Sequence, residues 1–421
     1  MKKKKIMVIS DHPLSISGVA HQTREFIFAL LRTGRYQFSC LGGAIKHENY
    51  QPMKTEEWGD DLVIFPVDGY GTPDIVRSLI RIEKPDVLWY MSDPRFYIWL
   101  NQIVDEIMPL MPVVWYTIWD NLPAPKYNYP AYISNSALVC ISKVTLGIVQ
   151  EIAPEIPSYY LPHAVNTNTF KKIEDVEAMT EFRKQVLPDE KNPNRMIFAW
   201  VNRNARRKQS GTLIYWFGKF LDKVGHDNAC LIMHTDPKDP NGQDLIRILH
   251  DFGLDKGQVI LSREKAPAES MGLLYNLADC TINISDAEGF GLSVVESLAS
   301  ETPVIANMTG GMTEQIIDDD GNHLGVGLEP ASKTLVGSQE VPYIFEDRLS
   351  EEQFVDALLK MYNMSAEDRA EIGKLGRAHV MKNFNYETFN ENWVKLIDKV
   401  VEENGSWATR KNYTPWRTLD L

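Results

Sequence analysis

The stretch from Thr281 to Ile316 constrains the fold more than any other part of this chain. Ile282 and Ile284 alternate with polar residues, which predicts a short strand, and a turn containing two glycines follows it. From Leu292 the apolar residues recur at helical spacing, and Pro303 opens a second apolar run that is typical of a buried strand. The stretch therefore predicts a loop that leaves the carboxyl end of a strand and enters a helix N-terminus.

The predicted helix N-terminus at residues 289–293 is a candidate anion site. The first N–H groups of a helix lack partners within the helix and carry a partial positive charge, so they favour an anion such as a diphosphate. Glu288 precedes this segment and Glu296 follows it. Carboxylates repel phosphate but accept hydrogen bonds from hydroxyl groups, so we expect Glu296 to bind a ribose diol and Glu288 a transferable sugar. Either glutamate taken alone also fits a simple complement to the helix dipole.

Strand-like and helix-like segments alternate along most of the chain. A strand at residues 6–10 is followed by a helix whose apolar stripe includes Phe26 and Leu30. The other strands expected in the first half are 38–41, 62–67, 87–91, 113–117, 138–142 and 159–161. Those expected in the second half are 196–201, 230–234, 259–261, 281–285 and 304–306. This alternation predicts an α/β protein with doubly wound parallel sheets.

The loop at residues 15–20 lies between the first strand and the first helix, where ligands bind in such sheets. It lacks the G-x-G-x-x-G pattern of dinucleotide-binding proteins, so the main sequence evidence for a dehydrogenase is missing.

Composition limits the class of protein and its partners. The chain has 421 residues, enough for two or three domains, and its net charge of -13 disfavours indiscriminate binding to nucleic acid or anionic lipid. The longest apolar run, at 108–119, is interrupted by prolines and falls short of the roughly 18 residues of a membrane span. The first residues contain too short an apolar segment for a signal peptide.

The four cysteines lie far apart, in apolar stretches without metal-binding spacing. They are Cys40, Cys140, Cys230 and Cys280. Reduced buried thiols are typical of a cytoplasmic protein, which is the expected location.

The run EGFGLSVVESLASETPVIANMTGG, from Glu288 to Gly311, resembles the signature of retaining glycosyltransferases of the GT-B fold, family 4. Its two glutamates have seven residues between them and enclose a G-F-G-L segment. A second segment, at 200–208, is similar to a strand of that family that is followed by an arginine and, five residues later, by a lysine. In this chain these residues are Arg203 and Lys208. The resemblance implies two Rossmann-like doubly wound domains that face a cleft.

The resemblance also implies the roles of particular residues. The residues expected to take part in catalysis are Glu288, Arg203, Lys208 and Asp120, with the two basic side chains gripping a diphosphate. The residues expected to bind the donor are Gly18, Phe290, Gly291, Leu292, Ser293, Glu296, Gly310 and Gly311. Many relatives have a histidine directly before the aspartate, and this chain has Trp119 there, which indicates an altered donor sugar, an acceptor-binding tryptophan or low activity. A loop-capping role fits Asp120 equally well.

The expected domains are an N-terminal acceptor domain at 1–170, a linker at 171–194 with one short helix, and a donor domain at 195–384. Residues 385–421 are expected to form a helix that crosses back to the first domain, followed by a tail.

The expected activity is transfer of a sugar from a nucleotide-diphosphate sugar to an acceptor hydroxyl, with retention and without a metal ion or a cofactor other than this donor substrate. The acceptor stays open among glycan, lipid, protein, small molecule and modified nucleic acid base, the last disfavoured by the charge. The alternatives are a nucleotide-sugar-binding protein with impaired catalysis, and an epimerase or phosphorylase on the same fold.

Overall fold

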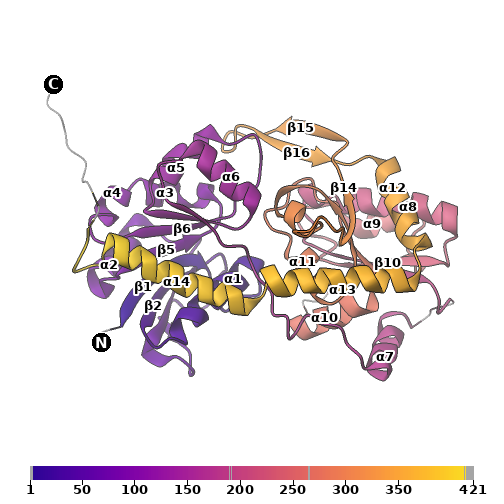
Figure 1. The fold of residues 1–421 in the computed structure, drawn as a ribbon, viewed down its shortest axis with the longest axis horizontal. Helices are drawn as coiled ribbons and strands as arrows, with labels where there is room; N and C mark the ends of the chain where they lie inside the picture. The colour runs from indigo at the N-terminus through magenta and orange to yellow at the C-terminus, as the bar shows by residue number, and fades with distance from the viewer. Residues whose placement is uncertain (1–2, 189, 191, 264–265, 412, 414–421) are drawn as a thin grey trace. The chain divides into compact units, whose positions relative to one another are not determined.

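The computed structural model describes residues 3–188, 190, 192–263, 266–411 and 413. Their contacts divide the chain into two compact units, one of residues 1–163, 337–343 and 386–421 and the other of residues 164–336 and 344–385 (Figure 1). The predicted domain bounds at 170, 194 and 384 stay predictions, and residues 412 and 414–421 of the predicted tail lie outside the described residues.

The first unit is built on a sheet with the strand order β3-β4-β2-β1-β5-β6-β7-β8. Its strands are β1 (Lys4–Asp11), β2 (Tyr36–Gly43), β3 (Met53–Lys54), β4 (Leu62–Pro66), β5 (Val87–Met91), β6 (Val113–Thr117), β7 (Ala137–Cys140) and β8 (Ser158–Tyr160). All neighbouring strands are parallel except β3 and β4. The longer helices are α1 (Gly18–Leu31), α2 (Pro73–Glu83), α6 (Lys143–Ile152) and α14 (Tyr386–Asn404), with shorter turns α3 (Ile98–Asn101), α4 (Val104–Ile107) and α5 (Tyr129–Ile133).

The second unit has a parallel sheet with the order β11-β10-β9-β12-β13-β14. Its strands are β9 (Met196–Val201), β10 (Ala229–His234), β11 (Val259–Ser262), β12 (Cys280–Asn283), β13 (Val304–Asn307) and β14 (Gly325–Leu328). Its helices are α7 (Val176–Val186), α8 (Ser210–Val224), α9 (Leu245–Asp251), α10 (Ala268–Leu277), α11 (Leu292–Ala299), α12 (Glu351–Asn363) and α13 (Ala366–Asn383). The predicted α/β class with parallel sheets is confirmed.

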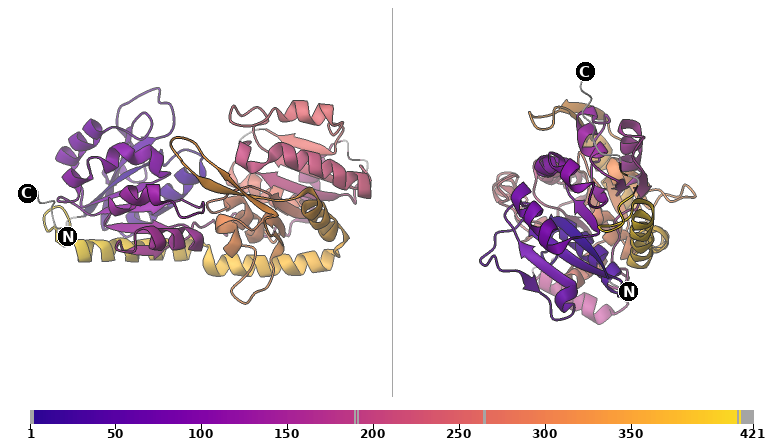
Figure 2. Two further views of the ribbon diagram at one scale, coloured as in Figure 1. Left: turned by 90° about the horizontal axis from the view of Figure 1, so that it is seen from above. Right: turned by 90° about the vertical axis from the view of Figure 1, so that its left-hand side faces the viewer.

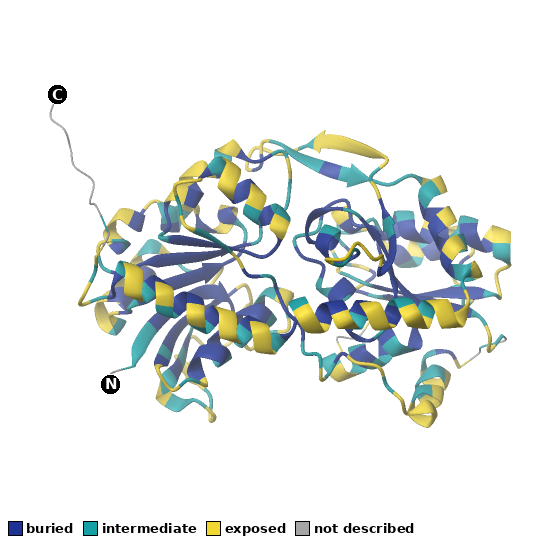
Figure 3. Ribbon diagram, viewed as in Figure 1, coloured by how far each residue is buried: buried dark blue, intermediate teal, exposed yellow. Residues whose placement is uncertain are grey.

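Strand β9 shows why such strands are apolar along their whole length. Phe198 and Trp200 pack into one hydrophobic cluster with residues of α8 and α12, whereas Ile197 and Ala199 pack into another with residues of α7 and α10. Successive side chains of a strand point to opposite faces, so a sheet covered on both sides needs apolar residues at every position. The central strands of the two large sheets are accordingly buried, and the helices expose residues on their outer faces (Figure 3).

The sequence patterns did not predict an antiparallel hairpin of β15 (Ser332–Val336) and β16 (Ile344–Arg348) (Figure 2, orange). Most of β15 is exposed, so it lacks the buried face that produces an alternating apolar pattern. Strand β14 was also missed, because its sequence of Gly325, Val326, Gly327 and Leu328 has few strand-forming side chains.

No helix in the described part of the chain has both the length and the apolarity that crossing a membrane requires.

Four aromatic rings pack together in the first unit, and one of them comes from the end of the chain. Trp393 of α14 is fully buried and lies 4.8 Å from Phe26 and 4.9 Å from Tyr116 between ring centroids. Phe26 in turn stacks on Trp89 at 4.3 Å. Helix α14 therefore completes a core whose other members lie more than 270 residues earlier, as the numbering of the sequence shows.

Trp393→Ala should lower the free energy of unfolding by about 3–5 kcal/mol, because it removes a large buried ring and leaves a cavity. Urea unfolding followed by circular dichroism measures the change. The matched control is Lys395→Ala on the same helix, whose side chain is 72% exposed and whose loss should change the stability by less than about 0.5 kcal/mol. Equal effects of the two substitutions would contradict this account of the core.

Candidate active site

The strand order of the second unit determines where a ligand can bind. Strand β9 pairs with β10 on one side and with β12 on the other, so the order reverses between β9 and β12. In open α/β sheets ligands bind beyond the carboxyl ends of the strands at such a point. The loops that leave β9 and β12 there are residues 202–209 and 284–291.

An ion pair between Lys208 and Glu288 joins these two loops. The ammonium group contacts the Glu288 carboxylate, and the side chains are only 7% and 12% exposed. Asn283 and Ser285 approach the same carboxylate oxygen at 3.5 Å. Burial alone would raise the pKa of Glu288, but the positive charges of Lys208 and Arg207 outweigh it and hold the pKa below its ordinary value. Glu288 is therefore a carboxylate at neutral pH.

Further hydrogen bonds, most of them to backbone groups, connect the two loops. The Asp286 N–H donates to the Arg207 carbonyl at 2.8 Å, and the Arg207 guanidinium donates to the Ala287 carbonyl. The Gln209 side-chain amide donates to the Asp286 carboxylate at 2.5 Å. Burial raises the pKa of Asp286 to about 6. The loops thus form one unit, with Lys208 and Glu288 at its centre.

Helix α11 begins where the sequence predicted it. Gly291 precedes its first residue, Leu292, and has φ +91°, a conformation that favours glycine. Ser293 lies in the first turn. The expected N-terminus for an anion is therefore present, although its binding role stays a prediction.

The loop after β13 packs against the loop that contains Phe290. A Cβ atom on Gly311 would lie 2.6 Å from the Phe290 Cα and 2.7 Å from the Gly289 carbonyl oxygen. The Gly311 N–H donates to the Glu288 carbonyl at 3.1 Å, and the backbone of Gly310 has φ +53°. The two glycines therefore allow a close approach of two backbones that supports the segment around Glu288.

Glu296 lies in α11, and its carboxylate accepts a hydrogen bond from the Tyr275 hydroxyl at 2.7 Å. Burial raises the pKa of Glu296 to about 7, and the tyrosine offsets only part of this effect. Glu288 and Glu296 therefore differ in charge near neutral pH, which the sequence alone did not indicate. Tyr275 is a residue that the sequence analysis missed, because nothing in its local pattern distinguishes it from other core aromatic residues.

Arg203 does not join the Lys208 and Glu288 pair. Its guanidinium forms two hydrogen bonds to Asp239, at 2.6 and 3.1 Å, and its side chain is 61% exposed. This contact lowers the pKa of Asp239 to about 2. The contact with Asp239 uses Nε and Nη2 of Arg203, and the expected role of this side chain in gripping a diphosphate stays a prediction.

The hairpin of β15 and β16 contributes a charged cluster that sequence patterns did not reveal. The Glu346 carboxylate is 2% exposed and contacts both Arg206 and Arg348, the latter at 2.5 Å. The next residue, Asp347, donates its N–H to the Asp286 carbonyl at 2.9 Å. Asn307 connects the same segments, because its amide donates to the carbonyls of Ser285 (2.9 Å) and Asp347 (2.7 Å). The hairpin thus supports both loops of the site from outside the sheet.

Two predicted site residues belong to the first unit. Gly18 is the first residue of α1, directly after the capping residue Ser17. Asp120 follows β6 in a loop and is partly buried. The preceding Trp119 is 5% exposed and donates its indole N–H to the Asn121 carbonyl at 2.9 Å. This tryptophan is therefore part of the packing of its own loop.

The second unit matches a known family. Residues 179–379 match the model described as glycosyl transferases group 1. The match supports a group 1 glycosyltransferase, and it includes both loops of the site.

Solved structures of low sequence identity share the fold. Sucrose-phosphate synthase from Thermosynechococcus elongatus has a TM-score of 0.74 and 14% identity over 95% of this chain and 100% of that one. Anabaena HepE in complex with UDP and glucose has a TM-score of 0.70 and 14% identity over 94% and 100% of the two chains. The GT-B fold class predicted from the resemblance is confirmed.

A curated relative matches a smaller part of the chain. The GDP-Man:Man(3)GlcNAc(2)-PP-Dol alpha-1,2-mannosyltransferase of Caenorhabditis elegans is 22% identical over 232 residues, which are 54% of this chain and 45% of that protein. The chain thus spans less than half the length of this relative.

Glu296→Gln should flatten the pH dependence of stability in the second unit. The folded-state pKa of about 7 exceeds the ordinary value of 4.5, so the stabilisation from the bound proton is complete below about pH 4.5 and is lost as the pH rises through 7. The melting temperature of the wild type should fall over that interval more steeply than that of the variant. Glu371→Gln, an exposed change on α13, should keep the wild-type slope, and parallel curves for Glu296→Gln and the wild type would contradict the assignment.

Gly311→Ala should destabilise the second unit by about 1–3 kcal/mol, since the added methyl group meets backbone atoms that must move. The control is Gly147→Ala in α6, where an added Cβ has nothing within 4 Å and a helical alanine should be neutral or stabilise by about 0.5–1 kcal/mol. Urea unfolding measures both changes, and a stable Gly311→Ala variant would show that the two loops are not closely packed.

Proposed function

We propose that this protein transfers a sugar from a nucleoside-diphosphate sugar to an acceptor hydroxyl, with retention of configuration at the anomeric carbon. The observation that carries the proposal is the buried ion pair of Lys208 and Glu288. It lies on the two loops that leave β9 and β12, where the strand order reverses, and both loops fall within the match to group 1 glycosyl transferases. HepE, a solved structure with the same fold, is described in complex with UDP and glucose, which supports a nucleotide sugar as the donor here.

The leaving group in such a reaction is a nucleoside diphosphate, and negative charge develops on it as the bond to the sugar breaks. Lys208, Arg203 and the backbone N–H groups at residues 289–293 would offset that charge, because donors fixed in advance stabilise a developing anion without reorganising. These groups supply positive charge at the diphosphate, so we propose a reaction without a metal ion.

The two glutamates would bind opposite ends of the donor. The ionised Glu288 would accept hydrogen bonds from sugar hydroxyls, and Glu296 would bind the ribose diol. Since hydroxyl donors favour the charged form of a carboxylate, donor binding would also lower the raised pKa of Glu296.

Retention is explained by attack on the same face of the sugar from which the diphosphate leaves. The bond between the anomeric carbon and the phosphate oxygen breaks, and a bond to the acceptor oxygen forms. The acceptor proton passes to the leaving phosphate oxygen, so that no separate base is required. A covalent intermediate on Glu288 is the less favoured route, because Lys208 already neutralises this carboxylate.

The acceptor is a hydroxyl compound whose class stays open, and the net charge of -13 disfavours nucleic acid. We place the protein in the cytoplasm, which is supported by four buried cysteines with free thiols.

A second candidate is a protein that binds a nucleotide sugar without turning it over. Trp119 favours it, because this residue stands where many members of the resembled family have a histidine. Its ring packs against Tyr127, with ring centroids 5.9 Å apart. An epimerase or phosphorylase is the remaining alternative.

A panel of nucleotide sugars tested by thermal shift identifies the donor, because a bound ligand raises the melting temperature. The donor is then incubated alone, with phosphate and a glycan, and with hydroxyl acceptors in the presence of a chelator. We expect transfer to an acceptor that the chelator does not stop. Binding without product supports the second candidate, and an isomerised sugar or a sugar phosphate indicates an epimerase or a phosphorylase.

Lys208→Ala should lower kcat by about 10²–10³-fold, as removal of other anion-stabilising donors does, and Glu288→Gln should also lower kcat strongly. Glu371→Gln, which removes an exposed carboxylate from α13 in the same unit, should leave the rate unchanged. Melting temperatures measured in parallel separate lost catalysis from lost folding. Full transfer activity of folded Glu288→Gln and Lys208→Ala proteins would refute the proposed site.

A further inference from the structure

A polar cavity of about 440 Å³ lies at the edge of the second sheet opposite to the candidate active site. Its lining includes Met196, the first residue of β9, and Asp279, which directly precedes β12. The two strands are parallel neighbours, so their amino ends lie at one edge, and the loops that contain Lys208 and Glu288 lie at the other. The cavity is therefore separate from the proposed donor site.

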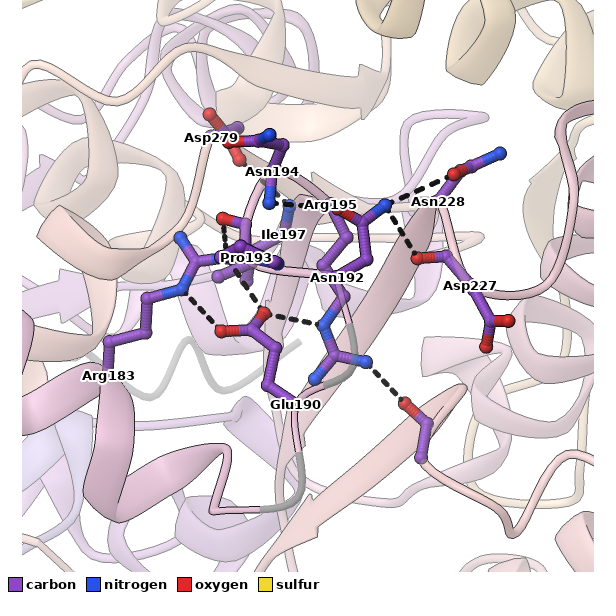
Figure 4. Close-up of polar contacts among 11 residues, drawn as sticks. Arg183, Glu190, Asn192, Pro193, Asn194, Arg195, Ile197, Asp227, Asn228 and Asp279 are labelled. Atoms are coloured by element: carbon purple, nitrogen blue, oxygen red, sulfur yellow. Dashed lines mark hydrogen bonds and ion pairs between the residues drawn. The ribbon is translucent and has the colours of Figure 1, made fainter.

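Three arginines from separate parts of the chain line this cavity. Arg183 comes from α7, Arg195 from the segment before β9, and Arg369 from α13. Arg183 and Arg195 both contact Glu190, and their nearest N–O distances are 2.8 and 2.9 Å (Figure 4). Figure 4 shows Glu190 held between the two guanidinium groups, which fixes their positions.

The third arginine is held more loosely by a carboxylate. Arg369 approaches Asp279 at 3.5 Å, whereas the other oxygen of Asp279 accepts the Ile197 N–H at 2.8 Å. Arg369 also donates to the Met364 carbonyl at 2.5 Å. Two carboxylates thus face three guanidinium groups, and the cluster carries one net positive charge.

The arginines keep donor groups beyond those that hold them in place. Arg183 uses Nε and Nη2, Arg195 uses Nε and Nη1, and Arg369 uses Nη1 and Nη2. Within the described residues, the remaining guanidinium nitrogen of each arginine makes no hydrogen bond. A guanidinium presents five N–H donors in a planar fork that matches the oxygens of phosphate and carboxylate. The cluster therefore offers prearranged donors and a positive charge to an anion.

We propose that this cavity binds a small phosphate-bearing molecule, with its phosphate group on the three arginines. A phosphate is favoured because it accepts several charge-assisted hydrogen bonds at once. The volume of the cavity falls within the roughly 300–1,000 Å³ range of small-molecule sites, so there is room for a group larger than phosphate beside Tyr362 and Asn194, which also line it. Free phosphate and a phosphomonoester share the chemistry that the arginines recognise.

The full chain is titrated with inorganic phosphate, glucose 6-phosphate and glucose, at constant ionic strength adjusted with chloride. Phosphate or the sugar phosphate should raise the melting temperature by about 2 °C or more near saturation, and glucose should not. A larger shift with glucose 6-phosphate identifies a phosphomonoester as the preferred ligand, and a larger shift with phosphate identifies the free anion. No shift with either compound overturns the proposal.

Variants locate the bound anion. Arg369→Gln should abolish the shift, and so should Asn194→Asp, which adds a negative charge to the lining without removing any arginine contact. Arg247→Gln is the control, because it removes an arginine that is 74% exposed on α9 of the same unit, and it should retain the shift. The Asn194→Asp protein keeps the test decisive if Arg369→Gln does not fold.

Lys208→Ala distinguishes the two sites. This variant alters the proposed donor site, and it should retain the phosphate shift if the anion binds among the arginines. A shift that persists in Asn194→Asp and disappears in Lys208→Ala would place phosphate in the donor site and overturn the proposal. Failure of the transferase assay would leave this binding result unaffected.

Discussion

The buried ion pair of Lys208 and Glu288 is the interaction on which the rest of the second unit depends. Two charges removed from water are stable only when they meet in good geometry and their remaining atoms are hydrogen-bonded. Lys208 follows β9 and Glu288 follows β12, so the pair requires these strands to be neighbours in register. The backbone contacts between the two loops and the polar groups of Asn283 and Ser285 supply the remaining constraints.

The surrounding elements hold this pair in position. Strands that are apolar on both faces cannot shift without exposing a core, and the glycines at 310 and 311 let a third loop support the Glu288 segment closely. The hairpin adds a second buried carboxylate, Glu346, between Arg206 and Arg348. The centre of the candidate site is consequently buried and connected by several polar contacts, whereas Arg203 remains exposed at its margin.

Sequence patterns predicted the sheets well and the supporting cluster poorly. The strands at 87–91, 113–117 and 196–201 were predicted with the bounds that the structure has, because runs of buried apolar residues are unambiguous between turns. The loop and the helix after β12 were predicted from the two glycines of the turn, Gly289 and Gly291. Glu346 and Tyr275 contact residues of the site from elements outside its two loops, and no local pattern encodes such contacts. The resemblance implied that Arg203 and Lys208 act together, whereas the structure pairs Arg203 with Asp239 and Lys208 with Glu288.

The first unit contains residues from both ends of the chain, since α14 returns to it after the whole of the second unit. Trp393 of α14 occupies the centre of an aromatic cluster formed otherwise by Phe26, Trp89 and Tyr116. During synthesis on the ribosome, the earlier three rings emerge long before the ring that covers them. The core of the first unit therefore stays incomplete until the second unit has been translated. Its last folding step is the packing of α14.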